Sequence, residues 1–313
     1  MPVTAADLER LLAVVRERAA GVEVGLFGPD SVTWRIDREA ITFLGAGRAL
    51  LLQLAHPWVA AGVAQHSRSF ADPIGRFHRT FQVVFSMVFG TTEQALVMAR
   101  RLHRRHESIT GVLPRTVGPF PAGSAYWANE VGALRWVHAT LMETALMVHE
   151  LAFPPLSPAD RARYIEESKL FARLFGIPPS AMPADWDEFA IYCRTMHDSP
   201  LLTVDDQARA LAREIFSRPI GPVSIPRWYR HVTAHLLPPR LRAAFGFAYG
   251  PAERDTALRA LDRARRLYAR LPDRLRYVGP YQEASARLAG RRHPDRFTQL
   301  LNRVWIGRPG LGG

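Results

Sequence analysis

The chain has 313 residues, of which 48% are apolar and 22% charged, a composition typical of a globular protein with a sizeable core. Its formal net charge is +12, but the arginines are spread among acidic residues along the chain, which indicates a solvated surface and no specific nucleic-acid site. The single cysteine, Cys193, excludes an intramolecular disulfide and a zinc site built from several cysteines. Since no uninterrupted apolar run could form a membrane span and the N-terminus lacks the pattern of a secretion signal, we predict a cytoplasmic protein.

The predicted elements are almost all helical. Residues 1–21 have amphipathic helical spacing. Two β-like runs at 22–27 and 31–36, separated by the turn signal Gly-Pro-Asp, predict a small β-hairpin near the N-terminus. The Gly-rich tail 307–313 is expected to be frayed. After the hairpin, helical periodicity predicts helices at about 39–56, 57–66, 73–89, 91–110, 130–150, 157–175, 183–197, 203–217, 222–236, 251–271 and 280–289.

No repeat or low-complexity linker separates two halves of the chain, so we predict one all-α domain over residues 1–313. The run "GAGRAL" at 45–50 lacks the third glycine of a dinucleotide fingerprint and no βαβ unit follows it, which favours small residues for close helix packing. His231 and His235 have the spacing of a one-helix metal pair, but no glutamate follows the first histidine, and a structural role is favoured. Di-iron bundles and α/β-hydrolases are disfavoured because their Glu-x-x-His and Gly-x-Ser-x-Gly motifs are absent.

The segment "LRWVHATLMETALM" at 134–147 predicts a strongly apolar helix with a histidine on its oily face. His138 is either a core histidine bonded within the protein or a metal ligand. An all-α protein with a deep apolar interior suits haem, whose iron takes a neutral imidazole and whose propionates pair with arginine. His56 and His106 also lie on apolar helices. Thiolate ligation by Cys193 stays open, although its mid-helix setting favours an imidazole.

Four runs of the sequence resemble one protein family: "FGPDSVTWRI", "GAGRALLLQLAHPWVAAGVAQHS", "DPIGRFHRT" and "ANEVGALRWVHATLMET". This is a bacterial oxygenase family of formerly unknown function, grouped with the latex-clearing proteins (rubber oxygenases) and a fungal oxygenase of mycophenolic acid biosynthesis. The resemblance covers about 24–245 and implies an all-α fold with a globin-like core that holds haem b, onto which helices at 251–301 would pack. The element from Arg135 to His138 matches the family's Arg-x-x-His element. The resemblance therefore implies that His138 is the axial iron ligand, in a cofactor site formed with Arg135, Leu134, Leu141 and Met142.

The resemblance also implies a distal side on a helix about thirty residues earlier, which here is the segment "ARRLHRRHESITG". Its candidates are His106, Arg104 and Glu107. The distal lysine of the rubber enzymes has no counterpart, because Lys169 lies elsewhere, and this departure argues against rubber-like chemistry. The function implied is a haem-b oxygenase acting on a small hydrophobic substrate, with O₂ on the side opposite His138.

Two other functions remain open at the level of sequence. One is a non-catalytic haem-binding protein, such as a carrier or a gas or redox sensor. The other is an Arg-rich helical binding module without a cofactor. Whether the protein forms a homodimer is also left open.

Overall fold

The computed structural model describes residues 2–66, 73–217 and 225–312. These residues form a mostly helical protein with one small antiparallel sheet, which confirms the predicted all-α class. None of the helices in the described part is long and apolar enough to cross a membrane. The α-helices are α1 (Ala5–Arg18), α2 (Val32–Asp37), α3 (Ala46–Leu54), α4 (Pro57–His66), α5 (Pro73–Phe89), α6 (Thr92–Glu107), α7 (Val131–Ala152), α8 (Pro158–Leu174), α9 (Trp186–Asp198), α10 (Asp206–Ser217), α11 (Arg227–Leu236), α12 (Pro239–Ala244), α13 (Pro251–Tyr268), α14 (Asp273–Arg276), α15 (Gly279–Leu288) and α16 (Arg296–Ile306).

Most of the predicted helices are confirmed to within a few residues. The predicted helix at 39–56 is divided into a 3-10 helix, η1 (Ala40–Gly45), and α3. The predicted ranges do not include the short helices α12 and α14, nor α16. Residues 222–224, which belong to the predicted helix 222–236, lie outside the described residues, and α11 begins at Arg227.

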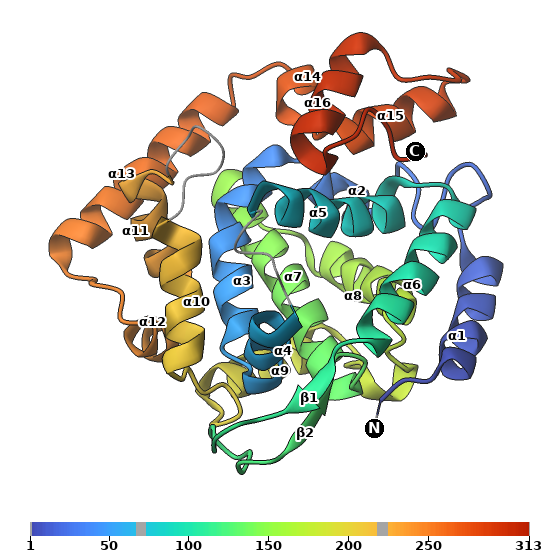
Figure 1. The fold of residues 1–313 in the computed structure, drawn as a ribbon. Coiled ribbons are helices and arrows are strands. Elements are labelled where there is room, and N and C mark those ends of the chain that lie inside the picture. The colour runs from blue at the N-terminus through green and yellow to red at the C-terminus, as the bar shows by residue number, and fades with distance from the viewer. Residues whose placement is uncertain (1, 67–72, 218–224, 313) are drawn as a thin grey trace.

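Helix α7 lies at the centre of the fold, with α3 along one side and α8 along the other (Figure 1). Two glycines allow close packing, one against α7 and the other against α11. A Cβ at Gly45 would stand 2.4 Å from Cγ2 of Thr144 on α7, and one at Gly47 would stand 2.5 Å from Oγ1 of Thr233 on α11. Any larger residue would push the helices apart, so the interpretation of "GAGRAL" as a close-packing segment is confirmed.

The predicted hairpin near the N-terminus is wrong, because residues 32–37 form helix α2. Ser31 caps this helix by accepting a hydrogen bond from the Trp34 backbone N–H at 3.1 Å. Glu167 of α8 accepts from the backbone N–H groups of Val32 and Thr33 at 3.1 and 2.7 Å. These contacts satisfy the free N–H groups of the first turn, and tertiary structure thereby overrides the β-propensity of the segment.

The sheet instead lies between α6 and α7 in the sequence. Strands β1 (Thr110–Val112) and β2 (Ala125–Trp127) pair antiparallel, with Gly111 opposite Tyr126. Tyr126 is buried, and its hydroxyl donates to Oε1 of Gln65 at 2.8 Å. The hairpin is thereby attached to α4.

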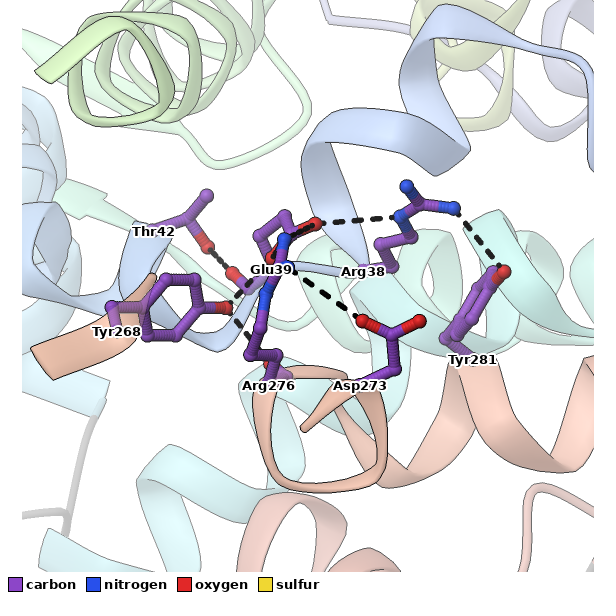
Figure 2. Close-up of polar contacts among 7 residues, drawn as sticks. All are labelled: Arg38, Glu39, Thr42, Tyr268, Asp273, Arg276 and Tyr281. Carbon is purple, nitrogen blue, oxygen red and sulfur yellow. Dashed lines mark hydrogen bonds and ion pairs between the residues drawn. The ribbon is translucent and has the colours of Figure 1, made fainter. Parts of the chain in front are cut away.

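The C-terminal helices are attached to the rest of the protein through a buried carboxylate, Glu39, shown in Figure 2. The hydroxyl of Tyr268 donates to Oε2 of Glu39 at 2.8 Å. Nη2 of Arg276 donates to both carboxylate oxygens, at 3.0 and 3.2 Å. We call Glu39, Tyr268 and Arg276 the Glu39 cluster. It joins the segment before η1 to the end of α13 and to α14.

The C-terminal tail packs onto the protein, at least as far as Leu311. This side chain is buried in the main hydrophobic core, and its backbone N–H donates to the carboxylate of Glu283 at 3.0 and 3.1 Å. The prediction of a frayed tail is therefore wrong for this residue. The same core cluster contains Leu8 of α1, so it extends over nearly the whole described sequence.

Candidate functional site

His138 lies in the middle of α7 and is 1% exposed. Its ring faces α8, with centroids 5.8 Å from Phe171 and 6.3 Å from Phe175. The side chain has a hydrogen bond with the backbone of Ser168, whereas Nε2 is buried and makes no hydrogen bond. Burial lowers the pKa of His138 to about 4, against the smaller opposing effect of the Ser168 bond. The ring is therefore neutral at pH 7 and has a nitrogen free to bind a ligand.

The helical neighbours of His138 are apolar, as the sequence indicates. Leu134 and Met142 are buried and Leu141 is half-buried. Leu134 packs with Val3 in a small cluster of its own, and Met142 belongs to the main core.

Arg135 faces a different helix from His138. Its guanidinium lies over the ring of Tyr192 on α9, with the carbon Cζ 3.8 Å from the ring centroid. Its Nε is buried without a hydrogen bond. The two residues of the Arg-x-x-His element thus share α7 but contact α9 and α8 respectively.

The three distal candidates lie in the last turn of α6. Arg104 and Glu107 are exposed, and His106 is half-buried. A hydrogen bond links His106 to Asn129, and burial together with the neighbouring His103 lowers its pKa to about 4. Of the three, only His106 is partly withdrawn from solvent.

The histidine of α6 that is buried is His103, which sequence reasoning did not select. Both of its ring nitrogens are buried without hydrogen bonds, and Nε2 stands 3.4 Å from the exposed carboxylate of Glu107. The signal was present in the sequence, because Ala95 and Ala99 precede His103 at intervals of four residues on the buried face of α6.

Residues 33–270 match the family described as "ER-bound oxygenase mpaB/B'/Rubber oxygenase, catalytic domain". The chain belongs to this family. The matched range begins in α2 and ends just after α13, so it includes α6, α7 and α8. No curated protein and no solved structure matched the chain. Membership identifies the protein as an oxidoreductase enzyme that uses O₂ and a substrate.

On the α3 side of α7, this oxygenase has a buried ion-pair network. Nη2 of Arg48 lies 2.8 Å from Oε2 of Glu143, and Nε2 of His197 lies 3.2 Å from the same oxygen. Burial raises the pKa of Glu143, but His197 and Arg48 lower it further than burial raises it. Every member of the network is engaged, so we assign it to structure.

Two of the other candidate groups, His235 and Cys193, are bonded or buried. Nδ1 of His235 lies 2.5 Å from the hydroxyl of Tyr249, whereas His231 is half-buried and lines a second cavity. Cys193 is buried in α9, and burial raises the pKa of its thiol. Within the described ranges, no three His, Cys, Asp or Glu side chains are grouped closely enough to hold a metal ion.

Proposed function

We propose that this protein is a haem-b-dependent oxygenase of a small hydrophobic substrate, with His138 as the axial ligand in a globin-like core. The observation that carries the proposal is Nε2 of His138, which is buried in apolar surroundings and makes no hydrogen bond. Ligating histidines commonly use their other nitrogen in a hydrogen bond that fixes the ring, and the bond to the Ser168 backbone suits that role. Haem bound there would supply the O₂ chemistry that the family's activity requires.

The residues around His138 fit such a group. Phe171, Phe175 and Met142 provide apolar surface for a flat macrocycle and exclude water from it. Arg135 has a buried Nε without a hydrogen bond, and it is our candidate to neutralise a propionate.

For the distal side we favour His103 over the sequence candidates Arg104, His106 and Glu107. His103 is buried, and its ring nitrogens are available to donate a proton or a hydrogen bond to a ligand. Both α6 and α7 pack against α8, which makes α6 a candidate to face the same side of the core as His138.

The same two histidines support a second candidate function, a non-catalytic haem protein such as a sensor or carrier. If His103 and His138 both bound the iron, no position would be left for a substrate-derived or oxygen ligand. A six-coordinate resting spectrum would favour this candidate, whereas a five-coordinate spectrum would favour the oxygenase.

The haem assignment is tested by expressing the protein with an adequate haem supply and recording its absorption spectrum. We expect a Soret band in the wild type and its loss, or a sharp reduction in haem content, in His138→Ala. His149→Ala is the matched control, because His149 is a buried histidine of the same helix whose Nδ1 also makes no hydrogen bond. A colourless wild type that takes up no added hemin would end the haem hypothesis. Haem loss in the control but not in His138→Ala would refute the residue assignment.

The distal assignment is tested by comparing His103→Ala with His106→Ala in the haem-loaded protein. We expect His103→Ala to change the resting spin state or the kinetics of carbon monoxide binding while haem is retained. His106→Ala should leave both unchanged, because its ring lies at the partly exposed end of α6. The reverse result would restore His106 as the distal residue.

A further inference from the structure

A cavity of about 330 Å³ lies at the C-terminal end of α7, apart from His138. His149 lines it and follows His138 by eleven residues on the same helix, which is about 16 Å along the helix axis at 1.5 Å per residue. Other lining residues come from α2 and the two residues after it, from α8, from α14 and from the loop after α7. They are Arg35, Arg38, Glu39, Phe153, Pro154, Pro155, Leu156, Asp160 and Arg276.

Several nitrogens around this cavity are buried without a hydrogen bond. They are Nε of Arg35, Nε of Arg38, Nε of Arg276 and Nδ1 of His149. His149 is 5% exposed. Since buried polar groups in proteins are nearly always hydrogen-bonded, so many unmade bonds around one space indicate a missing acceptor.

The arginines of the lining are held to different degrees. Nε of Arg38 lies 3.5 Å from Oε1 of Glu39, and Arg276 pairs with Glu39 and with Asp273, which lies outside the lining (Figure 2). Arg276 is held by Glu39, whereas Arg35 has its Nη2 2.8 Å from Oδ2 of Asp160 at the edge of α8. Arg35 is therefore the arginine whose carboxylate partner a ligand could replace or share.

We propose that this cavity binds a small organic monoanion, a carboxylate carried on an apolar body. Arg35 and Arg38 bind the carboxylate with His149 Nδ1–H as a further donor, and Phe153, Pro154 and Leu156 contact the apolar part. The apolar side chains of the lining favour a carboxylate on an apolar body over inorganic phosphate, which has no apolar part. The site does not depend on haem, because none of its residues contacts His138.

The test is calorimetric titration of the purified full chain with benzoate, its neutral isostere benzamide and inorganic phosphate. We expect benzoate to bind, benzamide to bind at least about tenfold more weakly, and phosphate to bind more weakly than benzoate. Absence of benzoate binding, or equal binding of benzamide or phosphate, would overturn the proposal.

Two variants with opposite expected effects locate the site. Arg35→Gln should weaken benzoate binding about tenfold, because it removes a charged donor. Asp160→Asn should strengthen it about threefold, because it frees Arg35 from a competing carboxylate while the side chain stays small and polar. The matched control is Arg16→Gln, since Arg16 is likewise paired with one carboxylate, Glu93, but lies outside the cavity lining.

The two substitutions are expected to change benzoate affinity in opposite directions. If Arg35→Gln folds poorly, the benzoate affinity of Asp160→Asn still tests the proposal. Weaker or unchanged binding in a folded Asp160→Asn would refute the role of Arg35. If Arg16→Gln weakened benzoate binding as much as Arg35→Gln, the affinity would depend only on the overall charge of the protein.

Discussion

Glu39 and His138 are both buried polar side chains, but they are partnered in opposite ways. Both oxygens of the Glu39 carboxylate accept hydrogen bonds from Arg276, and Tyr268 adds another, whereas Nε2 of His138 has none. A buried charge without partners costs several kcal/mol, while one unmade hydrogen bond of a neutral group costs about 1–3 kcal/mol. A fold can therefore leave the imidazole nitrogen free for a ligand but must satisfy the carboxylate. The Glu39 carboxylate is bonded through both of its oxygens within the fold, whereas Nε2 of His138 makes no hydrogen bond there.

The largest expected effect comes from breaking the Glu39 cluster. Glu39→Gln keeps the shape of the side chain but leaves the mostly buried guanidinium of Arg276 without its main counter-charge. We expect the free energy of unfolding to fall by about 3–5 kcal/mol in urea denaturation. Glu93→Gln is the control, because Glu93 pairs with Arg16 on the surface, and it should cost less than about 1 kcal/mol. Comparable losses in the two variants would contradict the structural role of the cluster.

The pH dependence of the unfolding free energy also tests how buried polar groups contribute to stability. Burial lowers the pKa of His56 to about 4, with Glu130 opposing weakly, so His56 stays neutral in the folded protein while it charges near pH 6.5 in the unfolded chain. Its contribution to stability is present above pH 6.5 and is lost as the pH falls from 6.5 toward 4, by about 2 kcal/mol at pH 5. His56→Leu should therefore make the fall in unfolding free energy between pH 7.5 and pH 5 shallower.

Asp37 provides the control of opposite sign. Burial and, to a smaller extent, Glu167 raise the pKa of Asp37 to about 7. Its contribution is present at low pH and is lost as the pH rises from its ordinary value near 3.8 through 7, so it opposes that of His56. Asp37→Asn should make the fall on acidification steeper. If His56→Leu and Asp37→Asn changed the pH dependence of the unfolding free energy in the same direction, these two groups would not govern it.

These two regions also differ in how far sequence could predict them. The helix around His138 follows from apolar spacing at i, i+3 and i+4, and that spacing placed Leu134 and Met142 on its buried side correctly. The Glu39 cluster joins residues 229 and 237 positions apart, and no local pattern marks such pairs. The cavity beside it is lined by residues of four helices and a loop, and no local pattern predicts it either.

The errors in prediction have local physical causes. The run at 31–36 has strand-like residues, yet Ser31 and Glu167 satisfy the N–H groups of a helix there. On α6 the buried face continues from Ala99 to His103, a residue that was not selected, while His106 stays a prediction. In the first case a distant side chain decided the outcome, which sequence alone could not show. In the second the helical spacing alone indicates that His103 is buried.

The smallest expected effect on stability, and the sharpest test of the comparison, is His138→Leu in protein prepared without haem. The substitution removes the hydrogen bond to the Ser168 backbone, but it also removes the unsatisfied Nε2 and fills much of the same space with apolar atoms. These effects oppose each other, so we expect the free energy of unfolding to change by less than about 1.5 kcal/mol.

His197→Leu is the matched control, because its Nε2 lies 3.2 Å from Glu143 in the buried network with Arg48. It should cost more than His138→Leu, since it leaves a mostly buried carboxylate with one partner fewer. Hemin titration of the same two folded variants should show uptake by His197→Leu and none by His138→Leu. A loss of stability in His138→Leu as large as in His197→Leu would mean that Nε2 is engaged within the fold, and a nitrogen already used for structure could not be kept for a ligand.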